Sequence, residues 1–98
     1  MTPEAFRAAL ALDAPPDLPA PLLALWHDAK GDWETAHRLV NDSPQPDAMW
    51  VHAYLHRVEG DLSNARYWYR RAGRAPHEGT LEEERGEILA ALLRKDAP

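Results

Sequence analysis

Three residues of the segment 52–59 carry side chains that could bind a metal ion. His52, His56 and Glu59 are spaced at i, i+4 and i+7, so a helix would place all three on one face. Two imidazoles and one carboxylate on a shared face form a ligand set that metal-dependent enzymes use. One interpretation of the chain is therefore a small metal- or ligand-dependent enzyme centred on His52, His56 and Glu59.

A structural role for the histidines is the alternative, and it is the one we prefer. A buried polar side chain without a hydrogen-bond partner costs about 1 to 3 kcal/mol. We therefore expect His27 and His56 to bond backbone carbonyls, Asn64 or the hydroxyl of Tyr67 within their own hairpins. On this interpretation the chain has no catalytic residue, no bound metal and no cofactor.

A stripe of arginines is the second group with chemical potential. Its members are Arg66, Arg70 and Arg74, at steps of four residues, with Arg71 beside them. Such a face could bind an acidic partner, phosphate or RNA. The glutamates of the segment 82–87 could instead neutralise it, either within the chain or across the homodimer that we expect. A net charge of -5 makes nucleic acid an unexpected partner.

Composition excludes several classes of protein. The 98 residues leave room for one domain, and 45% hydrophobic with 28% charged residues is typical of a globular chain. The absence of cysteine excludes disulfides, thiolate nucleophiles and cysteine-bound zinc. No phosphate-binding, nucleophile-elbow or HExxH motif is present. The chain shows no signal peptide and no apolar run near the roughly 18 residues that span a bilayer, so we expect a cytoplasmic protein that does not contact membranes.

The elements that position these residues are predicted to be helices, because alanine and leucine dominate while β-branched residues are scarce. Capping residues, glycines and prolines divide the chain into about six helices, which makes an all-α fold. We expect a single helical domain over 1–98. Its parts are an N-terminal helix in 1–13, a proline-rich connector in 14–19, a first hairpin in 20–46, a second hairpin in 47–76 and a C-terminal capping helix in 80–96.

The two hairpins share an internal repeat. Five residues of the first recur in the second at one offset of 29 residues: Ala24, His27, Gly31, Asp32 and Ala36 correspond to Ala53, His56, Gly60, Asp61 and Ala65. Together with Ala72 and Pro76, the second unit resembles the tetratricopeptide repeat. The first unit departs from that pattern, with a shortened second helix and Ser43 where the last alanine belongs. The segments GDWxxAH (31–37), HAYLHR (52–57) and NAxYWYRRAG (64–73) also resemble a narrower group of small proteins, a resemblance that implies no activity.

The resemblance to tetratricopeptide repeats implies a function. Such arrays bind proteins or peptides in a concave groove, which here would be lined by Trp26, Asp28, Trp50, Tyr54 and Arg57. Tryptophan, tyrosine and arginine dominate binding energies at protein interfaces. The alternative for these side chains is packing in the core against the first or last helix. We therefore expect a non-catalytic protein or peptide interaction module.

Overall fold

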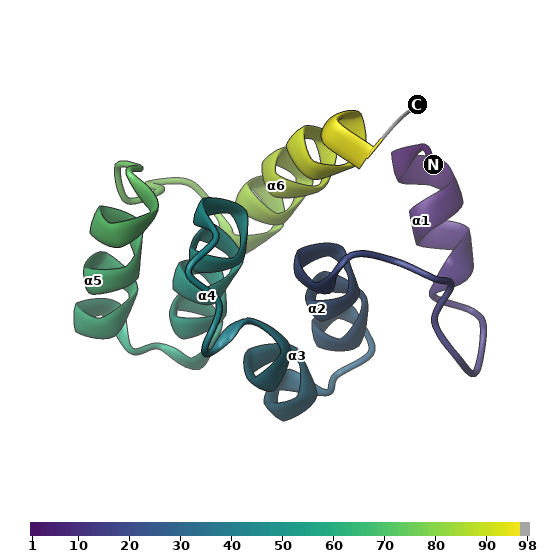
Figure 1. Ribbon diagram of the computed structural model, residues 1–98, viewed down its shortest axis with the longest axis horizontal. Helices are drawn as coiled ribbons and strands as arrows, with labels where there is room; N and C mark the ends of the chain where they lie inside the picture. The colour runs from purple at the N-terminus through teal and green to yellow at the C-terminus, as the bar shows by residue number, and fades with distance from the viewer. Residues whose placement is uncertain (97–98) are drawn as a thin grey trace.

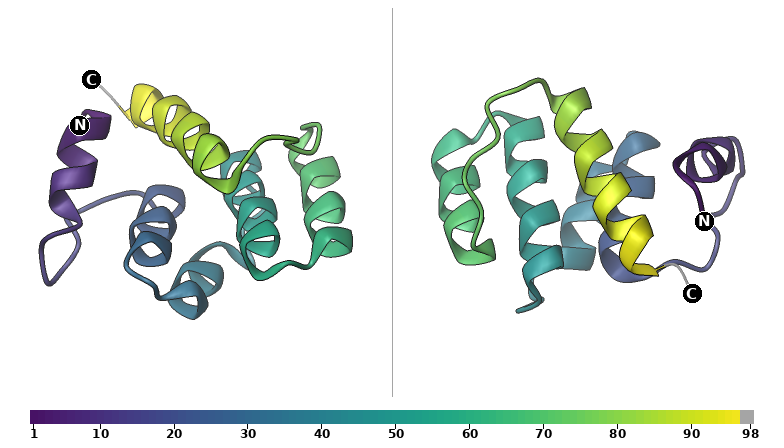
Figure 2. Two further views of the ribbon diagram at one scale, coloured as in Figure 1. Left: turned by 180° about the vertical axis from the view of Figure 1, so that it is seen from behind. Right: turned by 90° about the horizontal axis from the view of Figure 1, so that it is seen from above.

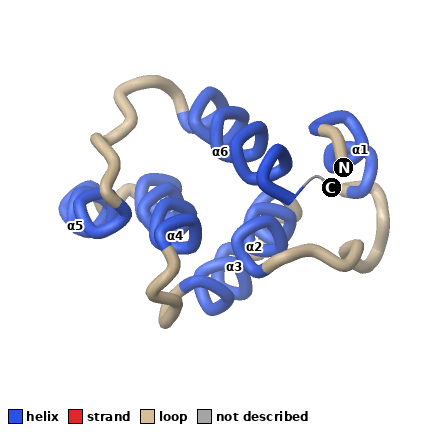
Figure 3. Tube along the Cα trace, turned by 45° about the horizontal axis from the view of Figure 1, so that its top comes forward, coloured by secondary structure: helices blue, strands red, loops and turns tan. Residues whose placement is uncertain are grey.

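The computed structural model describes residues 1–96, and over this range it consists of α-helices without any strand (Figures 1 and 3). The six helices are α1 (Pro3–Ala9), α2 (Ala20–Ala29), α3 (Trp33–Val40), α4 (Pro46–Glu59), α5 (Leu62–Ala72) and α6 (Leu81–Asp96). The predicted all-α fold of about six helices is confirmed. Residues 97 and 98 of the predicted domain lie outside the described residues.

The first helix is shorter than predicted. Thr2 caps it by accepting a hydrogen bond from the Ala5 amide, but α1 ends at Ala9 and not near residue 13. The Lys30 ammonium group explains this early end, because it donates to the carbonyls of Leu10 (2.6 Å) and Leu12 (3.1 Å). These carbonyls lie at the end of the helix, where no intrahelical amide is available to them.

The turns between α2 and α3 and between α4 and α5 have the same geometry. Gly31 and Gly60 adopt left-handed φ angles of 87° and 86°, which a side chain would disfavour. The amides of Asp32 and Asp61 then donate back to the carbonyls of His27 and His56, both at 2.9 Å. This hydrogen-bond pattern is the Schellman motif. Each turn therefore starts its second helix at an equivalent position.

The helices form a row that one further helix crosses. Helices α2 to α5 pack side by side in chain order, and α6 lies across α2 and α4 (Figures 1 and 2). Helix α1 packs against α6, close to the C-terminal end of the described chain. The apolar side of α6, with Ile88, Leu92 and Leu93, is buried against this row. The core therefore lies between α6 and the first helices of the two hairpins.

This packing overturns the predicted open groove. Trp26, Trp50 and Tyr54 are only 3%, 6% and 2% exposed, and they belong to the hydrophobic core. Arg57 donates inward, to Glu84 (2.6 Å) and to the Gly79 carbonyl (2.7 Å), while Asp28 is half-buried. The reason is that α6 must bury its own apolar side, and the face of α2 and α4 is where it does so. Core packing, the alternative considered for these residues, is what the structure shows.

No helix within residues 1–96 combines the length and the apolar character that crossing a membrane requires.

Candidate metal site

Three histidines converge between α3 and α4. His37 projects from α3, and His52 and His56 project from successive turns of α4. One ring nitrogen of each lies within 4.8 Å of the others, which is close enough for a common metal ion. His52 and His56 are 1% and 5% exposed, while His37 is half-buried. The sequence pattern therefore located two members of the site and missed His37.

The shortest contact of the cluster joins two imidazole nitrogens. His37 Nε2 and His52 Nε2 are 3.0 Å apart, so one of them carries the hydrogen and the other accepts it. The second nitrogen of His52, Nδ1, is buried and finds no hydrogen-bond partner among the described residues. A buried ring nitrogen without a partner costs free energy, so His52 is not explained by the needs of the fold alone.

The electrostatics of the site keep two of its imidazoles, those of His52 and His37, neutral. Burial lowers the pKa of His52 to about 3, and the nearby charges of His56, His37 and Arg71 act in the same direction. Burial and His56 also lower the pKa of His37, against a smaller opposing effect of Glu59. Near neutral pH both side chains are therefore uncharged. Neutral imidazole is the form that binds transition metals.

Two tryptophans hold the imidazole rings in place. Trp33 stacks on His37 with ring centroids 4.7 Å apart, and Trp68 of α5 stacks on His52 at 3.9 Å. The Trp33 indole is itself fixed, because its Nε1 donates to the Leu55 carbonyl at 2.7 Å. Residues of three helices thus fix the ring orientations, so a bound metal would cost less side-chain entropy.

Glu59 orients the third histidine from outside the cluster. His56 Nδ1 donates to Glu59 Oε1 at 2.6 Å, so Nε2 is the nitrogen of this ring that can serve as a metal ligand. The predicted set of His52, His56 and Glu59 is therefore corrected: His37 takes the third place, and Glu59 lies behind His56. A second group of close ligand atoms joins His56, Glu59 and Asp61, but Glu59 and Asp61 are exposed and Asp61 caps α5.

The expected hydrogen-bond partners of the repeated histidines are wrong. His56 bonds Glu59. The backbone N–H of Asn64 donates to the capping carboxylate of Asp61, and Tyr67 is 46% exposed, with its hydroxyl accepting from Arg71. His27, half-buried, contacts the edge of Trp26. The surroundings of the two histidines differ. Helix α3, the second helix of the first hairpin, packs against α4 and so lies beside His56, whereas no hairpin of the described chain precedes α2 to provide such a helix for His27.

The arginine stripe is not neutralised by the glutamates of α6 in the way that was expected. Within residues 1–96, Glu84 pairs with Arg57 and Glu87 pairs with His77, while Glu82 and Glu83 are exposed without an ion pair. The four arginines of the stripe, three in α5 and Arg74 just after it, make no ion pair there either.

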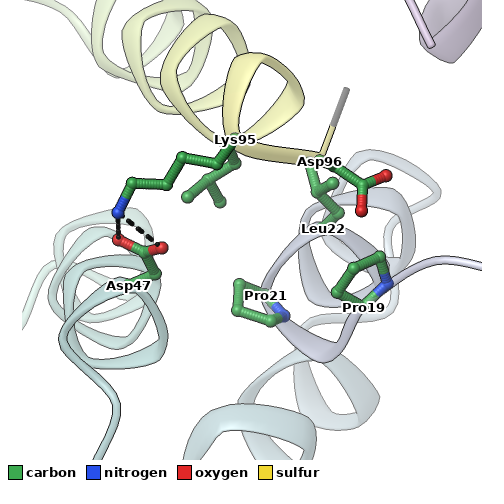
Figure 4. A pocket seen from close by; sticks show the side chains of 7 residues that line it. Pro19, Pro21, Leu22, Asp47, Lys95 and Asp96 are labelled. Carbon is green, nitrogen blue, oxygen red and sulfur yellow. Dashed lines mark hydrogen bonds and ion pairs between the residues drawn. The ribbon is translucent and has the colours of Figure 1, made fainter. Parts of the chain in front are cut away.

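A hollow of about 140 Å³ lies between α2, α4 and α6, away from the histidines (Figure 4). Pro19, Pro21 and Leu22 form one side of it, and of its three charged residues Lys95 and Asp47 bond each other at 3.1 Å. Asp96 is then the one charged group of the hollow outside this pair, so the hollow offers no converging groups comparable to the histidine cluster.

Comparison with known proteins adds no function: neither the family models, nor the curated proteins, nor the solved structures include a match to this chain.

Proposed function

We propose that this protein binds a divalent transition-metal ion through His37, His52 and His56. The observation that carries the proposal is the convergence of three imidazoles from two helices, with one ring nitrogen of each within 4.8 Å of the others. The site also keeps His52 and His37 in the neutral form that metal binding requires.

The spacing of the ligand atoms fits a small ion. Two nitrogens bound to tetrahedral zinc at about 2.0 Å lie about 3.3 Å apart. The 3.0 Å between the Nε2 atoms of His37 and His52 is near this value, and the other separations are no longer than 4.8 Å. Imidazole ligands suit zinc, copper and nickel. Three of them would leave one tetrahedral position for water or another ligand.

A metal titration tests the proposal. Metal-free protein without a histidine tag is titrated with Zn²⁺ against a chromophoric chelator, and one ion per chain is expected. His37→Ala and His56→Ala should each weaken binding by about tenfold or more, since each removes one ligand. His27→Ala and His77→Ala are the matched controls, because these histidines lie outside the cluster. Equal loss in the controls, or no binding by the unmodified chain, would disprove the metal site.

The interaction module expected from the sequence has weaker support. Its groove residues are buried, so the aromatic side chains Trp26, Trp50 and Tyr54 are not available to a peptide. We also propose that the hairpins are of the tetratricopeptide type, which the matching glycine turns support. A cytoplasmic location is proposed as well, and the lack of cysteine supports it.

A further inference from the structure

The exposed side of α5 and the residue that follows its C-cap carry cations that no part of the described chain neutralises. We call this surface the arginine face: Arg66, Arg70 and Arg71 of α5, and Arg74 just beyond it. All four side chains are exposed, and none lies within 4.0 Å of a carboxylate in residues 1–96. This concentration of positive charge contrasts with the net charge of the chain, which is -5.

Two of these guanidinium groups are held against aromatic rings. Arg74 Cζ lies 3.3 Å from the ring centroid of Trp50, and Arg71 Cζ lies 4.9 Å from that of Trp68. Trp50 is only 6% exposed, so its ring is a fixed support. A stacked guanidinium uses its flat face and keeps its N–H edges for acceptors. Ordering these side chains in advance reduces the entropy that a bound anion would cost.

We propose that the arginine face binds an acidic segment of a partner protein. Arg66 and Arg70 lie four residues apart on α5, a step of about 6 Å along the helix axis, and Arg74 follows shortly after the helix ends at Ala72. Carboxylates at i and i+4 of an acidic helix have the same spacing. Tyr67 and Leu62, 46% and 54% exposed on the same helix, provide apolar contact beside the charges. The net charge of -5 repels the long uniform charge of a nucleic acid more than the few charges of a short acidic protein segment, which favours the protein segment.

Fluorescence anisotropy with a labelled peptide tests this inference independently of the metal site. The probe is a helical peptide with glutamates at i and i+4, mixed with the full chain at low salt. The double variant Arg70→Gln/Arg74→Gln should bind it at least about fivefold more weakly. The control Arg38→Gln/Arg94→Gln removes the same charge from exposed positions of α3 and α6, and its affinity should change less than about twofold. Added salt should weaken binding of the unmodified chain.

Folding of the variants is checked by circular dichroism, since Arg74 contacts Trp50. A second pair, Arg66→Gln/Arg70→Gln, should weaken peptide binding as well, and neither of its arginines stacks on an aromatic ring in the described chain. Equal losses in the face and control variants would overturn the proposal, as would an absence of binding. Tighter binding of an oligouridylate than of the peptide would also overturn it. So would sedimentation that shows self-association abolished by Arg70→Gln/Arg74→Gln, because the occupant would then be a second copy of the chain.

Discussion

We expect the imidazole of His52 to lower the stability of the metal-free protein and to be required for metal binding. Its Nδ1 atom is buried without a partner among the described residues, while its Nε2 faces His37. Replacing it with leucine, a side chain of similar size, removes the unpartnered buried nitrogen, whereas the hydrogen bond that is lost with it joins His52 to His37, which is only half-buried. We expect His52→Leu to raise the free energy of unfolding of the metal-free protein by about 1 kcal/mol and to abolish Zn²⁺ binding.

Urea unfolding of the metal-free protein, followed by tryptophan fluorescence, measures the first part of this prediction, and the chelator titration measures the second. A His52→Leu variant that is clearly less stable than the original chain would show instead that the imidazole supports the fold, as the structural interpretation of the sequence expected.

Glu59 acts on the site through His56. Its carboxylate accepts the Nδ1 hydrogen at 2.6 Å, which fixes the ring and reserves Nε2 as its ligand atom. Glu59→Gln keeps a hydrogen-bond acceptor but removes the charge, so Zn²⁺ affinity should fall by about tenfold. Glu34→Gln, an exposed change on α3, is the matched control and should leave the affinity unaltered. Competition with the chelator compares both variants, and equal affinity for Glu59→Gln and the original chain would refute the orienting role.

At the scale of the elements, a buried carboxylate attaches α6 to the second hairpin. Glu84 is 1% exposed, and it accepts hydrogen bonds from Arg57 of α4 and from the hydroxyl of Tyr69 of α5. Glu84→Leu would leave both donors without their partner, so we expect a loss of about 3 kcal/mol. Glu84→Gln can still accept and should lose less. Chemical denaturation gives the values, with Glu82→Leu as the exposed control; an equal midpoint for Glu84→Leu and the control would contradict this role.

The same contact makes the fold sensitive to alkali. Burial, together with the hydrogen bond to Glu84 and its charge, raises the pKa of Tyr69 above the ordinary value of a tyrosine. Below about pH 10 the folded and unfolded chains both keep this proton, so its contribution to stability is complete. As the pH rises further, the unfolded chain releases the proton first, and stability falls by about 1.4 kcal/mol per pH unit.

Tyr69→Phe should remove this part of the alkaline decline. Tyr54, whose pKa burial raises to about 12, contributes a decline of the same sign that the variant retains. Urea midpoints measured at about pH 9 and about pH 11 give the comparison. If the two proteins lose stability equally over this interval, the Tyr69 proton does not stabilise the folded state.

At the scale of the whole molecule, a bound metal would connect the two hairpins. His37 belongs to the α2–α3 hairpin, whereas His52 and His56 belong to the α4–α5 hairpin. Because the unfolded chain does not hold the three rings together, Zn²⁺ at about 100 times its dissociation constant should stabilise the fold by about 2.7 kcal/mol. Thermal unfolding followed by circular dichroism should show a higher midpoint that a chelator reverses. The midpoint of His37→Ala should rise by no more than about half as much at the same Zn²⁺ concentration, because its binding is expected to be at least about tenfold weaker. An equal rise in that variant would place the ion elsewhere.

Local chemistry explains what the sequence by itself determined. The helix-forming composition specified an all-α fold, and the Gly-Asp pairs at 31–32 and 60–61 located both tight turns, because a left-handed glycine and a capping aspartate act within a few residues. The placement of His52 and His56 on one side of α4 is equally local, since it depends only on the helical repeat. The early end of α1 was missed because Lys30, distant in sequence, binds the Leu10 and Leu12 carbonyls.

Only the tertiary structure decided which faces meet. The one sequence signal for His37 is its i+4 spacing from Trp33 within the GDWxxAH segment, and that spacing does not reveal that α3 would present the ring to His52. Likewise, the aromatic face of α4 suits an open groove or a core, and the burial of α6 across it selected the core. Helix packing depends on how all apolar surfaces are covered at once, so neither the third histidine nor the closed groove could be derived from one helix at a time.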